Sequence, residues 1–449
     1  MPSRRFTALT AFAGGAAIFV ALTGCSASGS AASDASSGPI TIDFWHAMSG
    51  APATELDKLV AQFNSENKDG ITVKASFQGT YADTQTKYTA AVQSGSTPDL
   101  LMMNDVSTGF MVDSGQTVAA STFTKNDSSF DGDSIVTAAK KYYSGEDGLE
   151  AMPFSVSMPV LYLNKSLVEK AGLDTATPPK TLDEVATWAE KIHDTTGAYG
   201  MSMNMGDSWM LEELSAAGGE NFCTPENGRG SKKVAGVSLA SETQVGFMTT
   251  LQKLYQNGSA LNPGTDSAAM TSAFAADKVG MLLTSSGSYR TVDPDGTKSV
   301  VATFPTTADS KEAGQVIGGN ALWISGKGHS TVEQKASYEF AKWLVTADVQ
   351  ADWAKATGYI AMNTGAADTT VGKASQSDPN VATMHKQLAD DPSSTAAAGC
   401  ITGAFPAVRA TVIGAFNKVV EGADVTATML DAEKQAKSQI ASYNEAAGK

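Results

Sequence analysis

The chain has 449 residues, of which 42% are hydrophobic and 18% charged, and its formal net charge is −15 at pH 7. This composition is typical of a globular protein, and the negative charge disfavours binding to nucleic-acid phosphates or anionic lipid head groups. After residue 25 no apolar run approaches 18 residues, so the sequence predicts no further membrane-spanning segment.

The N-terminus predicts a bacterial lipoprotein signal peptide over residues 1–24. An arginine pair precedes an apolar segment at residues 6–22, which suits a cleaved export signal better than a spanning helix of roughly 20 apolar residues. The sequence Leu-Thr-Gly-Cys at residues 22–25 then places a cysteine where the cleavage site should be. We therefore expect Cys25 to carry a lipid that anchors the protein on the extracellular face of the cell membrane. The alternative is a plain signal peptide with a chance cysteine.

Residues 25–38 are mostly serine, alanine and glycine and carry no large apolar side chain. Such a segment cannot bury enough surface to offset the entropy of ordering it, so we expect a flexible tether. The folded part should begin near Pro39. What remains is longer than the length at which one hydrophobic core usually stops growing, so we expect two lobes.

Strand and helix patterns alternate along the rest of the chain, which predicts an α/β fold with parallel sheets. Short apolar or alternating runs predict strands at residues 40–45, 71–77, 99–103, 159–164, 279–284 and 321–325. Helical spacing and capping boxes predict helices after Pro52, over 83–94 and 166–172, after Thr181, from Ser330 through Trp353, and over most of the last 40 residues.

Sequence motifs for catalysis and for metal binding are absent. The four histidines are isolated, and the chain has no HExxH, paired CxxC, Walker lysine, GxGxxG or GxSxG. We therefore expect no enzymatic activity, no metal and no cofactor. Once Cys25 is assigned to lipid, Cys223 and Cys400 remain, and an extracellular protein can join them in a disulfide. Two buried free thiols are the alternative.

The segment PVLYLNKSLVEKAGLDTATPPKTLDEVAT at residues 159–187 resembles the middle of the family-1 extracellular solute-binding proteins of ABC importers. The resemblance runs from about residue 40 to 445. Four further segments resemble the members that bind sn-glycerol 3-phosphate and glycerophosphodiesters: FWHAMSGAPATELDKLVAQFN (44–64), FQGTYADT (77–84), ATGYIAMN (356–363) and FPAVRATV (405–412).

This resemblance implies a type II periplasmic-binding-protein fold, in which two α/β lobes are joined by a hinge and enclose a ligand cleft. Lobe 1 would hold residues 39–155 and 314–365, and lobe 2 would hold residues 156–313 and 366–449. The protein would be a monomeric, lipid-anchored receptor that captures a small solute and delivers it to the membrane subunits of an ABC permease.

The resemblance also implies which residues contact the ligand. Those on lobe 1 would be Tyr81, Asp105, Gly319 and Tyr359, and those on lobe 2 would be Ser157, Trp209, Ser285 or Ser286, and Arg409. An arginine offers a forked, permanently charged donor set for a phosphate. Hydroxyl groups and a glycine N–H add neutral donors, and the Asp105 carboxylate would accept from the vicinal hydroxyls of glycerol.

Two positions depart from the pattern of the glycerol-phosphate binders. Many of those relatives have a GW-x-x-W arrangement that walls the glycerol end, whereas MNMGDSWML at residues 203–211 keeps only Trp209, with Met205 nearest the vacated wall. Asp105 also replaces a longer glutamate. Both changes enlarge the site and favour a diester such as glycerophosphocholine, whose quaternary ammonium would meet an aromatic face by cation–π attraction.

Two other functions stay open at this point. An oligosaccharide receptor of the same fold predicts aromatic stacking platforms and no essential Arg409. An extracellular glycerophosphodiester hydrolase would need metal-binding clusters of histidine and carboxylates, which the sequence does not display. The preference between a monoester and a diester, the head group and the partner permease are also open.

Overall fold

The computed structural model describes residues 38–203, 205, 209–264, 267–306, 314–391 and 394–447. The expected signal peptide at residues 1–24, Cys25 and the tether through residue 37 lie outside the described residues. In the described part of the chain, no helix is both long enough and apolar enough to cross a membrane.

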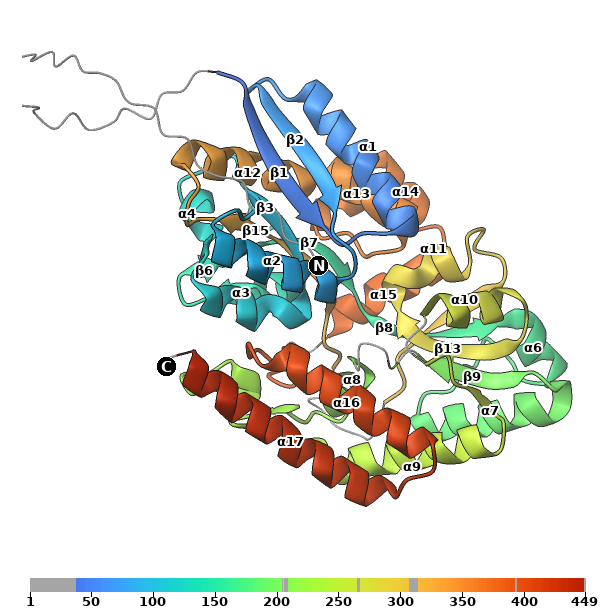
Figure 1. Cartoon of the computed structure of the whole chain (residues 1–449). Coiled ribbons are helices and arrows are strands. Elements are labelled where there is room, and N and C mark those ends of the chain that lie inside the picture. The colour runs from blue at the N-terminus through green and yellow to red at the C-terminus, as the bar shows by residue number, and fades with distance from the viewer. Residues whose placement is uncertain are drawn as a thin grey trace, which may run out of the picture. The chain divides into compact units, whose positions relative to one another are not determined.

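The first of two large sheets, here called sheet 1, has six strands and is built mainly from the N-terminal third of the chain (Figure 1). β1 lies between β2 and β3 and runs parallel to both, whereas β15 runs antiparallel to β3, β4 and β7. The strands are β2 (Ile71–Phe77), β1 (Ile40–His46), β3 (Leu100–Asn104), β15 (Gly318–Ser325), β4 (Thr117–Val118) and β7 (Met152–Ser157).

The second large sheet, sheet 2, has five strands. β9 runs parallel to β12 and β13, and β8 runs antiparallel to β13 and β14. In order across the sheet, the strands are β12 (Ala260–Leu261), β9 (Tyr199–Met203), β13 (Val279–Ser285), β8 (Pro159–Asn164) and β14 (Ser299–Thr303). Two short hairpins pair β5 (Ser144–Gly145) with β6 (Gly148–Leu149) and β10 (Cys223–Thr224) with β11 (Gly236–Val237).

The expectation of an α/β fold is confirmed, but the expectation of parallel sheets is wrong, because both sheets are mixed. Parallel neighbours need a long crossover connection, usually a helix. Here β7 ends in sheet 1 at Ser157 and β8 begins in sheet 2 at Pro159, so the chain changes sheets across Met158 with no helix between. β14 of sheet 2 is likewise followed in sequence by β15 of sheet 1. A strand that the chain enters from the other sheet, without a helical crossover, can pair antiparallel with its neighbours.

The helices cover both sheets. α1, α2 and α12 pack on strands of sheet 1, α6, α7, α10 and α15 pack on strands of sheet 2, and α16 and α17 pack on each other and on α9. The helices are α1 (Gly50–Glu66), α2 (Tyr81–Ser94), α3 (Thr108–Ser114), α4 (Ser121–Thr124), α5 (Thr137–Tyr142), α6 (Lys165–Lys170), α7 (Leu182–Thr196), α8 (Trp209–Ala217), α9 (Glu242–Gln256), α10 (Ser267–Ala275), α11 (Tyr289–Val292), α12 (Thr331–Leu344), α13 (Ala347–Thr357), α14 (Thr370–Ser375), α15 (Pro379–Asp390), α16 (Phe405–Val420) and α17 (Val425–Ala446). Short 3-10 turns are η1 (Asp105–Ser107), η2 (Glu226–Gly228), η3 (Ser286–Ser288) and η4 (Thr364–Asp368).

The capping boxes predicted at Thr181 and Ser330 are confirmed, since both side chains accept from the backbone N–H three residues on. The helix expected to run from Ser330 through Trp353 is wrong, because α12 ends at Leu344 and α13 begins at Ala347. The extended backbone of Thr346 separates them. The Gln350 amide stabilises the break by donating from Nε2 to the Leu344 carbonyl at 2.9 Å.

The expected lobe boundaries differ from the sheet elements at two places. β7 stays in sheet 1 through Ser157, beyond the boundary at residue 155. The boundary at residue 365 falls inside η4, and the following helix α14 still packs on α13. The division into two lobes remains a prediction, and the two sheets are the units that position the candidate site.

Candidate functional site

One edge of sheet 1 brings together several residues predicted to contact the ligand. Asn320, near the start of β15, pairs with Asn104 at the end of β3 on one side and with Ser155 of β7 on the other. Asp105 follows Asn104 directly. On the β7 side, Gly318 pairs with Ser157. The strand ends therefore place Asp105, Ser157 and the glycines of β15 at the same edge of one sheet.

Gly319 is required by the backbone at this edge. Its φ of +134° is open to glycine but strained for other residues, and a Cβ there would lie 2.0 Å from the Ser155 carbonyl oxygen. A Cβ on Gly318 would lie 3.0 Å from Ser157 Oγ and 3.1 Å from Trp209 Cζ2. The indole of Trp209, at the start of α8, is therefore packed against Ser157 and the start of β15.

Tyr81 reaches the same edge from the first residue of α2. Its hydroxyl accepts a hydrogen bond from Asn320 Nδ2 at 3.1 Å. Burial raises the pKa of Tyr81 well above 10, so the phenol is neutral at physiological pH. Because its oxygen accepts from Asn320, its own proton remains to be donated elsewhere.

Tyr359 follows α13, and its neighbour Ile360 donates its N–H to the Val156 carbonyl of β7 at 2.9 Å. The Tyr359 ring stacks on Trp353 with a centroid separation of 5.9 Å. Burial, with a smaller contribution from the charge of Asp105, raises the pKa of Tyr359 to about 12. Tyr359 is thus a second neutral hydroxyl next to β7.

Ser285 and Ser286 lie where β13 passes into η3, and their side chains bind the backbone. Ser286 Oγ accepts from the Met158 N–H at 3.1 Å, and Ser286 N–H donates to the Met158 carbonyl at 2.8 Å. Ser285 Oγ accepts from the Gly287 N–H at 3.1 Å. A Cβ on Gly287 would lie 2.9 Å from the Tyr359 ring. Both serines therefore lie close to Tyr359 and to the crossing at Met158, and each has a structural role there.

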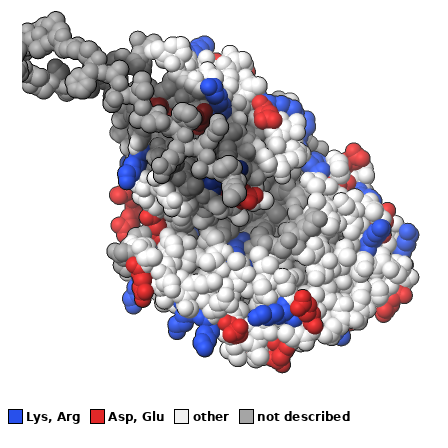
Figure 2. All heavy atoms as spheres, viewed as in Figure 1, with Lys and Arg blue, Asp and Glu red and all other residues white. Residues whose placement is uncertain are grey.

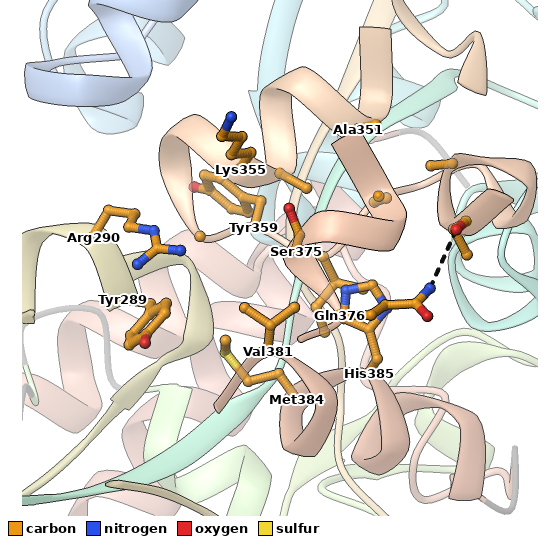
Figure 3. Close-up of a pocket in the computed structure, with 17 residues that line it drawn as sticks. Tyr289, Arg290, Ala351, Lys355, Tyr359, Ser375, Gln376, Val381, Met384 and His385 are labelled. Carbon is orange, nitrogen blue, oxygen red and sulfur yellow. Dashed lines mark hydrogen bonds between the residues drawn. The ribbon is translucent and has the colours of Figure 1, made fainter. Parts of the chain in front are cut away.

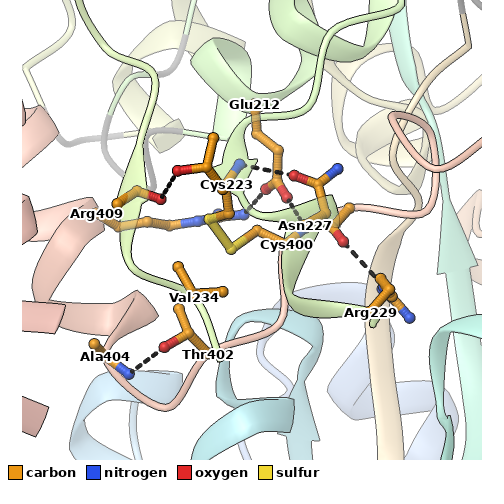
Figure 4. The surroundings of a disulfide bond; sticks show 12 residues. Glu212, Cys223, Asn227, Arg229, Val234, Cys400, Thr402, Ala404 and Arg409 are labelled. Carbon is orange, nitrogen blue, oxygen red and sulfur yellow. Dashed lines mark hydrogen bonds and ion pairs between the residues drawn. A yellow bond between two sulfur atoms is a disulfide. The ribbon is translucent and has the colours of Figure 1, made fainter. Parts of the chain in front are cut away.

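Arg409, on α16, is buried and paired with two carboxylates. Its Nη2 lies 2.8 Å from Glu212 Oε2 and 3.8 Å from Asp105 Oδ2. The guanidinium carbon lies 4.8 Å from the centroid of the Phe405 ring, in cation–π contact. Figure 4 shows Glu212 between Arg409 and Cys400, whose N–H donates to Glu212 Oε1 at 2.8 Å. The predicted phosphate-binding arginine therefore has a buried acidic partner that sequence reasoning missed.

Glu212 and Glu213 are adjacent, fully enclosed carboxylates on α8. Burial raises the pKa of Glu212, and the charge of Arg409 opposes that shift. Burial and the neighbouring Glu212 charge raise the pKa of Glu213 well above its usual range. Glu213 Oε2 accepts from the Val316 N–H at 2.9 Å, on the segment that enters β15. Two acids in the mostly apolar run WMLEELSAA (209–217) were the sequence signal for this pair.

Met205 is 1% exposed and packs in the same core as Trp209. Of the residues that precede Trp209 in the loop after β9, only Met205 is described. Its role as a wall of the ligand site remains a prediction.

The structure joins Cys223 to Cys400 in a disulfide, with the Cα atoms 5.6 Å apart (Figure 4). This separation lies within the usual range for disulfides. The bond connects the β10–β11 hairpin to the segment before α16. Together with the Cys400–Glu212 hydrogen bond, it attaches this segment to α8.

We expect thiol labelling of the denatured, unreduced protein to modify neither Cys223 nor Cys400, and labelling after reduction to modify both. A Cys25→Ser background removes the third cysteine from the count. The chain-entropy model assigns roughly 4–5 kcal/mol to closing so long a loop, so reduction should also lower the melting temperature. Two labelled thiols without reductant would show that the cysteines are free.

Two of the hollows in the described part of the chain are lined by residues of this region. The cavity in Figure 3 is bordered by α11, α13, α14 and α15, and it includes Tyr359, but only about 30 Å³ of it is open, too little for a solute. A groove of about 570 Å³ runs between α3, the β5–β6 hairpin and residues 228–234. Arg229 borders this groove and already donates from Nε to the Gly399 carbonyl at 3.0 Å and from Nη1 to the Tyr142 carbonyl at 3.2 Å. Neither hollow therefore replaces the cluster around Arg409 as the candidate site.

Charge on the surface gives no competing anion site on the face shown in Figure 2. There, among the described residues, lysines and arginines are interspersed with acidic side chains. Three potential metal ligands also lie together, namely Asp99, His329 and Glu333. His329 Nδ1 is hydrogen-bonded to Asp99 Oδ1 at 2.8 Å, and Glu333 accepts from the Ser330 N–H at the start of α12. This group therefore has a structural role at the start of α12.

Comparison with known proteins identifies the family. A sequence model of the bacterial extracellular solute-binding proteins matches residues 58–383. The sn-glycerol-3-phosphate-binding periplasmic protein UgpB of Escherichia coli K12 is 29% identical over 412 residues, which cover 89% of this chain and 92% of that protein. Its homologue UgpB from Mycobacterium tuberculosis, solved in complex with glycerophosphocholine, has a TM-score of 0.76 at 20% identity and covers 90% of this chain and 99% of that one.

A receptor solved with a different ligand has nearly the same fold similarity. The GacH receptor of Streptomyces glaucescens, solved unliganded and with acarbose, has a TM-score of 0.75 at 20% identity, covering 91% of this chain and 99% of that one. At this identity, the two structures establish the fold and leave the ligand open. Because the family model spans most of the chain, the protein belongs to the bacterial extracellular solute-binding proteins, the non-enzymatic receptors of ABC importers.

Proposed function

We propose that the chain is a lipid-anchored receptor that captures glycerophosphodiesters, glycerophosphocholine in particular, or sn-glycerol 3-phosphate, by closure of two lobes. The observation that carries the proposal is the buried Arg409 beside Asp105, close to an edge of sheet 1 that carries Ser157 and Gly319 and that Tyr81 and Tyr359 approach. An arginine held away from solvent is a strong donor for a single anionic group.

Each residue has a chemical task in this proposal. Arg409 binds the phosphate, Tyr81 and Tyr359 donate neutral hydrogen bonds, and the Asp105 carboxylate accepts from glycerol hydroxyls. Trp209 presents an aromatic face to the choline ammonium. The similarity to the two UgpB proteins supports this assignment. A ligand that touches both lobes favours the closed state through its differential contacts, and the permease would read that state.

A second candidate is an oligosaccharide receptor. The specific observation in its favour is the ion pair between Arg409 and Glu212, because an arginine already neutralised by a buried acid can serve an uncharged ligand. In that case the stacked Tyr359 and the buried Trp209 would be platforms for sugar rings.

Calorimetric titration of the purified protein against glycerophosphocholine, sn-glycerol 3-phosphate and maltose separates these candidates. Binding of either phosphate ligand without maltose supports the proposed function. Binding of maltose alone supports the oligosaccharide receptor and overturns the phosphate proposal.

The lipid anchor is tested by replacing Cys25. We expect Cys25→Ser to move the protein from the membrane fraction to the medium, or to leave an uncleaved precursor, because serine lacks the thiol that takes the lipid. Fractionation followed by immunoblotting and intact-mass measurement checks this result. Cys223→Ser is the matched control and should keep the protein in the membrane fraction. Normal processing and membrane retention of Cys25→Ser would contradict the anchor.

A further inference from the structure

The edge of sheet 1 carries two buried polar atoms that have no hydrogen-bond partner among the described residues, Asn320 Oδ1 and Ser155 Oγ. Asn320 is 0% exposed and Ser155 is 1% exposed. A buried polar atom without a partner is costly, so such atoms are rare in native proteins and require an explanation. Asn320 and Ser155 differ from the other buried atoms of this kind in being direct cross-strand partners, so one polar ligand group would satisfy both.

The strand register places both side chains on the face of sheet 1 that Tyr81 approaches. Asn320 and Ser155 are direct partners in neighbouring antiparallel strands, so their side chains lie on the same face of sheet 1. Asn320 Nδ2 donates to the Tyr81 hydroxyl, which identifies this face as the one that Tyr81 approaches. A β-bulge follows between Asn320 and Ala321. The extra residue is Phe154 of β7, next to Ser155, and bulges are over-represented beside functional sites.

We propose that Asn320 and Ser155 form a hydroxyl subsite, which binds two neighbouring hydroxyl groups of the ligand. This inference rests on the proposed function and orients its ligand. The Asn320 Oδ1 atom can only accept, and the Ser155 hydroxyl can both donate and accept. A phosphodiester has no proton to donate to Oδ1, whereas a vicinal diol can satisfy both atoms. The glycerol end of the ligand therefore lies on sheet 1, and the phosphate faces Arg409.

Asn320 also orients Tyr81 for the same ligand. Its Nδ2–H group donates a hydrogen bond to the Tyr81 hydroxyl oxygen, so the Tyr81 proton is directed away from Asn320. Asn320 is thus a binding residue through Oδ1 and a positioning residue through Nδ2. Loss of the whole side chain should cost more affinity than loss of the Ser155 hydroxyl.

The test pairs Ser155→Ala with two ligands that differ only in the proposed contact. Propylphosphocholine has the three-carbon chain and head group of glycerophosphocholine but neither hydroxyl. We expect Ser155→Ala in the full-length protein to weaken glycerophosphocholine binding by about fivefold or more and to change propylphosphocholine binding by less than about twofold. Asn320→Ala should reduce the preference for glycerophosphocholine further. Because Ser155 Oγ bonds to no described residue, ligand-free Ser155→Ala should melt no lower than the wild type.

Ser325→Ala is the matched control, since Ser325 is a buried serine at the other end of β15. It should leave both affinities unchanged. If Ser155→Ala leaves the affinity for glycerophosphocholine unchanged, or lowers the affinities for both ligands equally, the hydroxyl subsite is overturned while the proposed function stands. If the wild-type protein binds neither glycerophosphocholine nor sn-glycerol 3-phosphate, the proposed function itself is overturned, and the ligand of the subsite with it.

Discussion

Arg409→Ala is expected to weaken the binding of glycerophosphocholine by tens-fold or more. Removing one partner of a buried, hydrogen-bonded charge pair typically costs about 2–5 kcal/mol, and about 1.4 kcal/mol is a factor of ten in affinity. The guanidinium of Arg409 lies beside the Asp105 carboxylate, and the Arg409 residue is only 7% exposed. Calorimetric titration of the variant measures the loss. Unchanged affinity of the variant for glycerophosphocholine would falsify the phosphate-binding role of Arg409 and favour the oligosaccharide-receptor hypothesis.

The same substitution leaves Glu212 as a buried charge without its ion pair. Breaking a buried pair by removing one partner destabilises a protein by about 3–5 kcal/mol, so weak binding could reflect poor folding. The double variant Arg409→Ala, Glu212→Gln removes that uncompensated charge, and the glutamine can still accept from the Cys400 N–H. We expect it to regain melting temperature without regaining affinity. Affinity that recovers along with stability would show that the arginine acts on the fold rather than on the ligand.

Glycerophosphocholine is expected to bind at least about tenfold tighter than sn-glycerol 3-phosphate. A phosphate monoester carries roughly −1.5 to −2 charges at pH 7, whereas a diester carries one. Two carboxylates, Asp105 and Glu212, already lie beside the guanidinium of Arg409, so the additional charge of the monoester is disfavoured. The diester also places its ammonium over an aromatic face, worth about 0.5–2 kcal/mol. Side-by-side calorimetry gives the ratio of the two affinities.

Met205→Trp is expected to reduce the difference in affinity between glycerophosphocholine and sn-glycerol 3-phosphate. The larger indole would fill space in the site that the smaller ligand leaves empty. Met205→Leu is the matched control, since it keeps a side chain of similar volume and should preserve the wild-type ratio. Equal or tighter binding of the monoester by the wild-type protein would show that the size and charge of the site have been misread.

Local features of the fold were predictable because their causes lie within a few residues. The strands at residues 71–77 and 159–164 have the predicted bounds, and the capping boxes at Thr181 and Ser330 begin α7 and α12. The break before α13 is also local. Thr346 at the N-cap position and Asp348 in the first turn are signals for the start of a helix. The helical spacing of apolar residues across this position nevertheless led to the prediction of one longer helix.

Strand direction and charge pairing were not predictable in this way, because their causes lie far apart in the chain. Glu212 and Arg409 are separated by 197 residues, and nothing near either residue specifies the other. The positions of Tyr81, Asp105 and Arg409 as ligand contacts came from resemblance to a family and not from composition or periodicity. The resemblance named residues that the structure brings together, but it omitted Asn320 and Glu212, which set the hydrogen bonding and the charge around them.

The Cys223–Cys400 bond has a practical consequence for anyone who produces this receptor. Cys400 presents its backbone N–H to Glu212, and Glu212 in turn holds the guanidinium of Arg409. Material made in a reducing cytoplasm would lack the covalent link that fixes this chain of contacts. Affinities measured on such material would describe a less organised arginine than the one the exported protein carries. Oxidation state is therefore a variable to control in every binding assay of this protein, as much as salt or pH.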